Sequence, residues 1–284
     1  MTYNSGLEFS DILSINIDDL LQRIDMNKAS LLILDGGIGE GKTTLAVHIA
    51  DYIHKKKGLG KINFKESLAM GGEEFLERLR ICYRNELPVI IYDEAGDFNR
   101  RGALTRFNAM INRTFETFRA FKILVILCLP SFHVLDNELF DKQIPRVLLH
   151  VKDRTMAQGN FYGYSLYRMR YIKHKIGKLI VPNFAYTQVQ PNFYGHFHDL
   201  PKTRAKELDK VSTTGKLKVL VKSEIKIKGL LGYPELSAKL SRSIVWVRVH
   251  INKLKIKPRQ IINRAKYFNE EDLNRLSDHL EGLD

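Results

Sequence analysis

The sequence predicts an α/β fold with a mostly parallel central sheet, followed by a smaller C-terminal module. Short apolar runs at residues 29–34, 88–92 and 122–129 have the length and composition of buried strands. Segments with helical spacing alternate with these runs, as expected when helices cover both faces of a parallel sheet. With 284 residues and 44% hydrophobic content, the chain is long enough for one large domain and a small second one.

Each strand of the first half has a helical neighbour. Residues 17–24 are predicted as a short helix, and the strand at 29–34 leads into a glycine-rich loop and an amphipathic helix closed by lysines and Gly58. Residues 73–84 and 103–121 have helical spacing and precede the second and third strands. The order strand, glycine loop, helix is the one that a phosphate-binding site requires.

Beyond Pro145 the pattern changes. Residues 146–151 and 161–176 alternate apolar and polar side chains, which predicts antiparallel edge strands. Residues 183–199 have no clear periodicity, and the polar stretch 201–215 is predicted to be a linker. We therefore expect a large first domain at residues 1–200, the linker, and a second domain at residues 216–284.

The C-terminal segment has the order of a winged or MerR-like helix-turn-helix. Residues 234–240 and 243–252 are predicted as helices separated by a turn at Ser241, and a basic β-like stretch follows them. A last helix begins after Asn269 with Glu270 and Glu271 in its first turn, where a cap and acidic residues are favourable. Because residues 243–252 are rich in β-branched side chains, a strand is the alternative there.

The charge is concentrated in one stretch. The whole chain has 45 Lys and Arg against 32 Asp and Glu, a net charge of +13. Residues 202–259 carry 16 basic and 4 acidic side chains, whereas residues 1–201 carry 26 and 22. A solvated lysine-rich surface would explain scattered charge, but a local net charge of +12 beside a foldable pattern favours a nucleic-acid partner.

Several protein classes are excluded by composition. The hydrophobic content excludes a disordered chain, and two cysteines, Cys82 and Cys128, are too few for a disulfide scaffold. Both lie in apolar surroundings and are expected to be buried thiols of a reducing compartment. The N-terminus shows no signal peptide, and the longest apolar run, 123–130, is too short to span a bilayer. We expect a cytoplasmic protein without membrane insertion.

The glycine-rich loop satisfies the pattern G-x-x-x-x-G-K-[ST] of a P-loop through Gly36, Gly41, Lys42 and Thr43. Glycines let backbone N–H groups turn toward phosphate oxygens, Lys42 reaches the β- and γ-phosphates, and Thr43 offers its hydroxyl to Mg²⁺. A simple exposed turn is the alternative, but the flanking strand and helix argue against it. The predicted nucleotide-binding set is Gly36, Gly37, Ile38, Gly39, Glu40, Gly41, Lys42, Thr43 and Thr44.

An Asp-Glu pair ends the strand at residues 88–92. Asp93 is predicted to help hold the metal, and Glu94 to orient and deprotonate the attacking water. Taken alone, the pair could be an ordinary solvated strand end. Together with the loop it predicts hydrolysis of ATP with Mg²⁺ rather than a GTPase-type switch.

The stretches LCLPSFHVLD (127–136) and KQIPRVLLHV (142–151) follow this pair, and in this order they resemble the FtsK/HerA superfamily of DNA-pumping ATPases. Virus packaging ATPases and Zot-like assembly ATPases share the general pattern. The resemblance covers roughly residues 28–175 and implies a RecA-like domain acting in a homo-oligomer, as in a hexameric ring. In the family's motif the nucleotide residues match Lys42, Thr43, Asp93 and Glu94.

Two features of the family are less clear here. The position of the polar sensor falls at Cys128, a weak hydrogen-bonding thiol, so either Ser131 takes that role or the γ-phosphate is sensed differently. The resemblance also implies an arginine supplied by a neighbouring subunit to neutralise charge on the phosphoryl group. Arg146 matches the family's strand, and Arg106, Arg113 and Arg119 are the other candidates; each could equally be a surface charge.

The basic module is predicted to contact DNA, most simply double-stranded DNA, with residues 243–252 in the major groove. The candidate contacts are Arg242, Trp246, Arg248, Lys253, Lys255, Lys257 and Arg259. Two functions follow. The first is an ATP-hydrolysing DNA motor for translocation, packaging or remodelling. The second is an ATP-dependent assembly switch that acts as a DNA-binding regulator or partition factor. A membrane assembly ATPase is the weakest alternative, because no anchor is visible.

Overall fold

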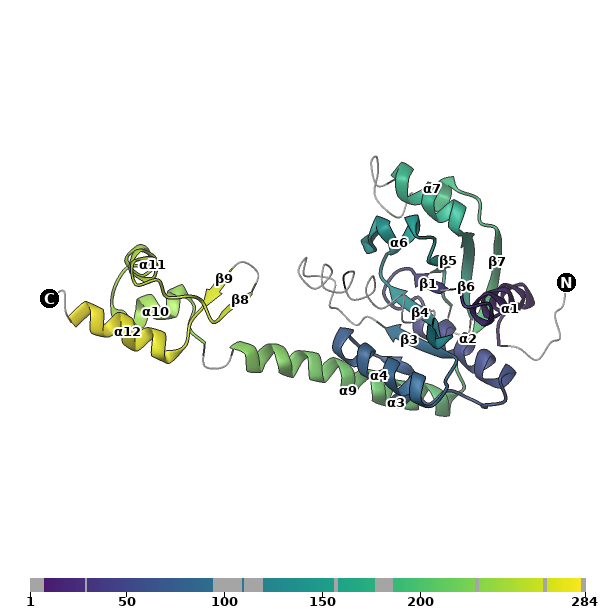
Figure 1. Cartoon of the computed structure of the whole chain (residues 1–284), viewed down its shortest axis with the longest axis horizontal. Helices are drawn as coiled ribbons and strands as arrows, with labels where there is room; N and C mark the ends of the chain where they lie inside the picture. Colours follow the sequence, from purple (N-terminus) through teal and green to yellow (C-terminus); the bar gives the residue numbers. More distant parts are fainter. Residues whose placement is uncertain are drawn as a thin grey trace. The chain divides into compact units, whose positions relative to one another are not determined.

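The computed structural model describes residues 8–28, 30–93, 109, 120–155, 158–176, 186–227, 230–262 and 265–281. The chain divides into two compact units, Met1–Thr213 and Thr214–Asp284 (Figure 1). Each has its own hydrophobic core. No helix in the described residues is both long enough and apolar enough to cross a membrane.

Unit 1 is built on a seven-stranded sheet in the order β2-β3-β4-β1-β5-β6-β7. The segment from β2 to β5 is parallel, and β6 and β7 add to it in antiparallel fashion. One strand, β4, therefore lies between β1 and β3. The strands are β1 (Leu31–Asp35), β2 (Leu68–Ala69), β3 (Val89–Asp93), β4 (Leu124–Leu129), β5 (Pro145–Lys152), β6 (Gln158–Ser165) and β7 (Phe193–His198).

The central strands are apolar on both faces because helices cover both sides of the sheet. In β1, Leu32 and Leu34 belong to one core, and Leu31 and Ile33 belong to the other. The alternation follows from the two-residue period of a strand. The first core is filled by side chains of α1 (Asp11–Asp25), α2 (Lys42–Lys56), α3 (Phe64–Ser67) and the start of α9 (Lys202–Ile227). The second is filled from α4 (Gly72–Arg84), α6 (Asn137–Asp141) and α7 (Leu166–Ile176).

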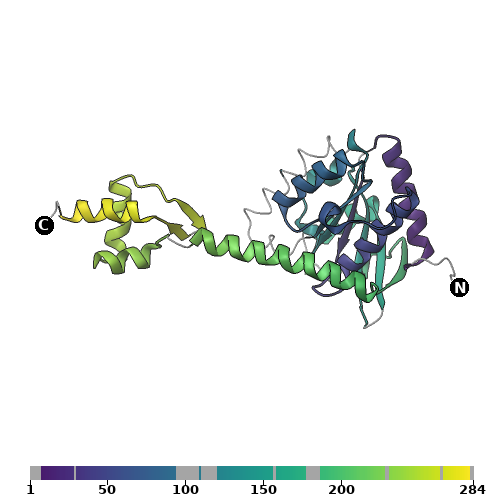
Figure 2. The ribbon, with the colours of Figure 1, turned by 90° about the horizontal axis from the view of Figure 1, so that it is seen from below.

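This arrangement confirms the predicted α/β class with a mostly parallel sheet. Figure 2 shows α1, in purple, and α4, in blue, on opposite sides of the strands. The strands expected at 29–34, 88–92 and 122–129 are β1, β3 and β4. Most of the helix expected at residues 103–121, and Glu94 with it, lies outside the described residues.

Four local expectations differ from the structure. Residues 146–151, expected to be an antiparallel edge strand, belong to β5, which pairs in parallel with β1 and lies inside the sheet. The alternating pattern at residues 161–176 is a strand only as far as Ser165, after which α7 begins. Its buried residues, Met169 and Ile172, have helical spacing that the surrounding tyrosines and basic residues obscure. The segment without periodicity, 183–199, contains β7. Residues 202–215 of the expected linker lie within α9.

Among its described residues, unit 2 contains the end of α9, three further helices and a two-stranded hairpin. Helices α10 (Tyr233–Leu240) and α11 (Ile244–Lys253) are joined by a short turn in which Ser241 has a left-handed backbone, with φ +51°. Strands β8 (Gln260–Ile262) and β9 (Ala265–Tyr267) precede α12 (Glu270–Glu281). Its core contains Leu236, Leu240, Val247, Ile251, Ile256, Phe268 and Leu276.

Side-chain caps stabilise the starts of α11 and α12. Ser243 Oγ accepts a hydrogen bond from the Trp246 N–H at 3.2 Å, which makes residues 244–253 a helix despite their β-branched side chains. Asn269 Oδ1 accepts from the Asp272 N–H at 3.0 Å, and Asp272 Oδ2 accepts from the Asn269 N–H at 3.2 Å. This reciprocal pair is a capping box, as the sequence predicted for the start of the last helix.

Candidate functional site

The backbone of the loop between β1 and α2 leaves no room for a side chain at two of its glycines. Gly36 has φ +142°, and a Cβ there would lie 2.1 Å from the Val151 carbonyl oxygen. Gly41 has φ +92° and packs against the ring of Phe197, 3.1 Å from where its Cβ would be. Both positions therefore require glycine, one because of a neighbouring backbone and the other because of its left-handed conformation.

The loop ends at the first turn of α2, where the Lys42 ammonium and the N-terminus of the helix both face the loop. Gly41 is the N-cap and has no side chain to occupy the first N–H groups of the helix, so these can serve a ligand. Lys42 Nζ donates to the carbonyl oxygens of Gly36, at 2.8 Å, and Gly37, at 2.6 Å. An ammonium group and a helix N-terminus thus converge on one loop, which fits a chain of phosphates.

Thr43 and Asp93 come together although fifty residues separate them. Thr43 Oγ1 donates to Asp93 Oδ2 at 2.8 Å, from the first turn of α2 to the end of β3. A hydroxyl and a carboxylate beside a phosphate loop are the oxygen ligands that suit Mg²⁺. Within the described part of the chain, no three His, Cys, Asp or Glu side chains gather into a metal cluster. The metal would therefore be held by these two residues together with phosphate and water.

The parallel sheet, the order β3-β4-β1 and the loop before α2 identify unit 1 as a RecA-like P-loop NTPase fold. The assignment rests on this topology. The phosphate loop lies at the carboxyl ends of the parallel strands, where ligands bind in open α/β sheets.

Comparison with known proteins gives only distant similarities. No protein-family model matches the chain, and no curated protein matches its sequence. A KaiC-like protein from Pyrococcus horikoshii is similar at 12% identity, with 48% of this chain and 78% of the other covered and a TM-score of 0.32. The N-terminal domain of zonular occludens toxin from Neisseria meningitidis is similar at 13% identity, with 48% and 84% covered and a TM-score of 0.27. The flagellar accessory protein FlaH from Methanocaldococcus jannaschii is similar at 16% identity, with 52% and 84% covered and a TM-score of 0.26.

A buried carboxylate supports the base of the loop, and the sequence analysis did not single it out. Asp35 ends β1, is 1% exposed, and accepts a hydrogen bond from the Phe132 N–H at 3.1 Å. His150 Nδ1, on β5, lies 2.9 Å from Asp35 Oδ1, and the Tyr186 hydroxyl donates to Oδ2. Asp35 therefore joins β1 to β5, to the turn after β4 and to the 3₁₀ turn at Tyr186–Gln188.

The tyrosines around Asp35 are held in their neutral form. Burial, followed by the charge of Asp35, raises the pKa of Tyr186 well above its ordinary value. The same two causes, in the same order, raise the pKa of Tyr164 to about 12. The Tyr186 ring also stacks on His150, with ring centroids 3.7 Å apart. A neutral tyrosine hydroxyl is a hydrogen-bond donor, so this cluster keeps Asp35 fixed directly before the phosphate loop.

The expected sensor positions lie at the neighbouring strand end. Cys128 pairs in register with both Leu34 and Asp93. Burial, and then the charge of Asp93, raises the pKa of its thiol well above the ordinary value, so Cys128 stays a neutral thiol. Ser131 caps the following 3₁₀ turn and accepts from the His133 N–H at 3.4 Å. That Cys128 or Ser131 senses the γ-phosphate stays a prediction.

Arg146 lies far from the phosphate loop of its own chain. It follows Pro145, which pairs with Leu31 at the start of β1, whereas the loop follows Asp35 at the opposite end of β1. Desolvation, together with the nearby charge of Arg23, lowers its pKa. The prediction that Arg146 completes a site therefore concerns a neighbouring subunit only. The alternatives Arg106, Arg113 and Arg119 lie outside the described residues, as does the predicted base, Glu94.

In unit 2 the predicted DNA contacts fall into two groups. Arg242, Arg248, Lys253, Lys255 and Lys257 are exposed. Trp246 stacks on His250 with centroids 3.8 Å apart and packs against the core, and Arg259 forms an ion pair with Asp272 at 3.2 Å. These contacts give Trp246 and Arg259 roles in holding unit 2 together. Arg248 also lies over the ring of Tyr233, 5.2 Å from its centroid. The exposed cations of both groups are where a polyanion would meet this unit.

Proposed function

We propose that the protein is a Mg²⁺-dependent ATPase. The hydrogen bond from Thr43 to Asp93 carries the proposal, because it brings the phosphate loop and the end of β3 into one site. Lys42 and the N-terminus of α2 would neutralise the phosphate chain, and bound Mg²⁺ would offset the charge on its β- and γ-oxygens. Glu94, next to Asp93 in sequence, would orient and deprotonate the attacking water.

The direct test is ATP hydrolysis by the full-length protein with Mg²⁺. Glu94→Gln should still bind ATP and fail to hydrolyse it, whereas Asp93→Asn should weaken both steps, because Asp93 is the proposed partner of the metal. Lys57→Ala, at the far end of α2, is the matched control and should hydrolyse ATP as the wild type does. A wild-type protein that binds no ATP in the presence of Mg²⁺ would overturn the proposal.

We further propose that unit 2 binds DNA, most simply double-stranded DNA, and that hydrolysis drives movement or remodelling of that DNA. The support is the net charge of +10 over residues 214–259, from 12 basic and 2 acidic side chains, and the exposed cations on and after α11. Two helices joined by a short turn and followed by a hairpin also have the element order of a winged helix-turn-helix, in which α11 would enter the major groove.

Stimulation of hydrolysis separates the two functions. A motor should hydrolyse ATP faster with duplex DNA at low salt and should displace a bound roadblock as it moves. An assembly switch, the alternative, should bind DNA in one nucleotide state without processive movement. Imaging with a non-hydrolysable ATP analogue and duplex DNA adds a second criterion. A closed homo-oligomeric ring around the DNA supports the motor, and Arg146 would then be tested as the arginine supplied to the neighbouring site.

A further inference from the structure

Arg154 lies against the phosphate loop, although no sequence motif points to it. It follows β5, in the connection to β6, and its main-chain N–H donates to Glu40 Oε2 at 3.1 Å. Its Nη1 donates to the Gly39 carbonyl oxygen at 3.4 Å. A Cβ on Gly41 would lie 3.2 Å from the same Nη1. One arginine therefore contacts three consecutive residues of the loop.

The same guanidinium also pairs with Asp199, which lies shortly before α9. Arg154 Nη2 forms an ion pair with Asp199 Oδ1 at 2.5 Å. Asp199 directly follows β7 and stands three residues before α9 begins at Lys202. Arg154 therefore contacts both the loop that would hold phosphate and Asp199, which lies three residues before α9.

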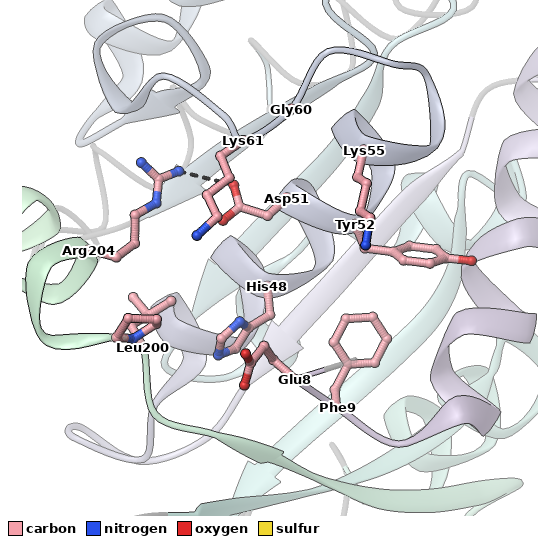
Figure 3. A pocket seen from close by; sticks show the side chains of 11 residues that line it. Glu8, Phe9, His48, Asp51, Tyr52, Lys55, Gly60, Lys61, Leu200 and Arg204 are labelled. Carbon is pink, nitrogen blue, oxygen red and sulfur yellow. Dashed lines mark hydrogen bonds and ion pairs between the residues drawn. The ribbon is translucent and has the colours of Figure 1, made fainter. Parts of the chain in front are cut away.

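The start of α9 is also tied to α2, the helix that begins with Lys42 and Thr43. Arg204 forms an ion pair with Asp51 of α2 at 3.0 Å (Figure 3). The guanidinium of Arg204 also lies over the ring of Phe64, 3.9 Å from its centroid. His48 Nε2, on α2, lies 2.8 Å from the His198 carbonyl oxygen. The first turn of α9 is thus joined to the middle of α2 through Arg204, and the end of β7 is joined to the same helix through His48.

The two ion pairs differ in exposure, and this difference suggests different roles. The side chains of Arg204 and Asp51 are 11% and 17% exposed, whereas those of Arg154 and Asp199 are 30% and 37% exposed. A pair as exposed as the second is screened by water and contributes little to stability. It can therefore exchange partners when another anion approaches. The phosphate chain of a nucleotide in the loop is such an anion, and it would compete with Asp199 for Arg154.

We propose that Arg154 is a positioning residue for the nucleotide reaction and that its ion pair with Asp199 links the phosphate loop to the start of α9. The inference rests on the proposed ATPase function. Arg154 holds Gly39, Glu40 and Gly41 in the shape that receives phosphate. Nucleotide binding weakens its hold on Asp199, and the first turn of α9 responds. Because such coupling is reciprocal, a change at the start of α9 also alters nucleotide affinity.

The first test measures the affinity for a non-hydrolysable ATP analogue and the steady-state constants of hydrolysis in the full-length protein. Arg154→Ala should weaken binding about tenfold and raise KM by a similar factor with kcat nearly unchanged, the size expected for one charge-assisted hydrogen bond. Arg154→Lys should recover part of the loss, because lysine keeps the charge without the fork geometry. Arg170→Ala, which removes an ion pair with Asp141 of 3.3 Å, is the matched control and should leave the affinity unchanged.

The second test measures amide hydrogen exchange at residues 199–206 with and without saturating analogue. The wild type and Arg170→Ala should show faster exchange there when nucleotide binds. Arg154→Ala and Asp199→Asn should exchange equally fast in both states, even though the analogue still saturates them. A purely structural role of Arg154 would not abolish this response.

The outcomes separate this inference from the proposed function. A wild type that binds no nucleotide overturns both. A wild type that binds and hydrolyses ATP, together with an Arg154→Ala variant of unchanged affinity and unchanged exchange response, overturns the role of Arg154 alone. Loss of affinity with an intact exchange response keeps the positioning role and overturns the link to α9.

Discussion

The two units place their charge and their chemistry differently. Met1–Thr213 carries 30 basic and 24 acidic side chains, a net charge of +6, and Thr214–Asp284 carries 15 and 8, a net charge of +7 in a third of the length. Unit 1 assembles its site from the ends of buried strands, where Asp35, Lys42, Thr43 and Asp93 are held by defined partners. Unit 2 presents exposed cations over a core of seven residues.

This difference indicates two kinds of binding. A preorganised site recognises one ligand geometry, so a single substitution in it should have a large effect. A surface of exposed cations binds a polyanion through summed charge, so each cation should contribute a small and similar share. The first two predictions test whether the two units fold and act independently. The last two measure how much single residues contribute to each unit.

The largest effect is expected in the core of unit 2. Phe268 is completely buried there, and Phe268→Ala should cost about 3–5 kcal/mol, enough to unfold a unit of this size. Calorimetry should then show loss of one transition, while ATP hydrolysis without DNA persists. Ile261→Ala, at a side chain 60% exposed, is the control. Loss of hydrolysis together with unit 2 would show that the units are not independent.

The next effect is expected at the phosphate loop. Lys42→Ala removes the ammonium that lies over Gly36 and Gly37, and should lower the rate of ATP hydrolysis by about 10²–10³-fold, as for other preorganised donors. DNA binding in the absence of nucleotide should remain as in the wild type. Lys57→Ala provides the control, since Lys57 only pairs with Asp25 at 3.4 Å. If Lys42→Ala hydrolysed ATP at the wild-type rate, the loop would have no role in the reaction.

A smaller effect is expected from the tyrosines beside Asp35. The pKa of Tyr164 is about 12 in the folded protein and about 10 in an unfolded chain, so between these values the unfolded state binds fewer protons. The free energy of unfolding of unit 1 should therefore fall as the pH rises from about 10 to about 12, by at most about 3 kcal/mol from Tyr164. Tyr164→Phe should flatten that fall in urea titrations, whereas Tyr194→Phe, at a side chain 73% exposed, should not.

The smallest effects are expected from single cations of unit 2. Lys255→Ala and Lys257→Ala should each weaken DNA binding to a similar extent for every sequence. Each should also reduce the slope of log affinity against log salt by about 0.9, if it contacts one phosphate. Lys239→Ala is the control in the same unit, because Lys239 lies 3.8 Å from Glu270. A loss confined to one DNA sequence would indicate base reading instead of a phosphate contact.

The sequence predicts best those features whose determinants are neighbours in the chain. The phosphate loop follows from eight consecutive residues, and the start of α12 follows from Asn269 and the acidic residues after it. Residues 201–215 were expected to be a linker because they are polar and charged, and residues 202–215 instead form the first half of α9. The sequence pattern at residues 244–253 allowed either a helix or a strand, and the structure has a helix there with Ser243 as its cap.

The parts of the site that the sequence does not show are those assembled by the sheet. The partners of Asp35 are Phe132, His150 and Tyr186, which are 97, 115 and 151 residues away. Arg154 likewise meets Glu40 across 114 residues. No local spacing encodes such contacts, because they depend on which strands become neighbours. Sequence reasoning predicted a site at the glycine loop and Asp93, which the structure brings together, and it missed the residues that hold the loop in place.

The strand β4 between β1 and β3 acts as a spacer for the site. Neighbouring strands lie about 4.8 Å apart, so the backbones at the ends of β1 and β3 are separated by about 10 Å. Thr43, in the first turn of α2, reaches across this distance to the Asp93 carboxylate. Backbone hydrogen bonds set this width, and side chains of β4 do not. Cys128 could therefore change without altering the room left for phosphate and metal, whereas any insertion that displaced β4 from the sheet would close it.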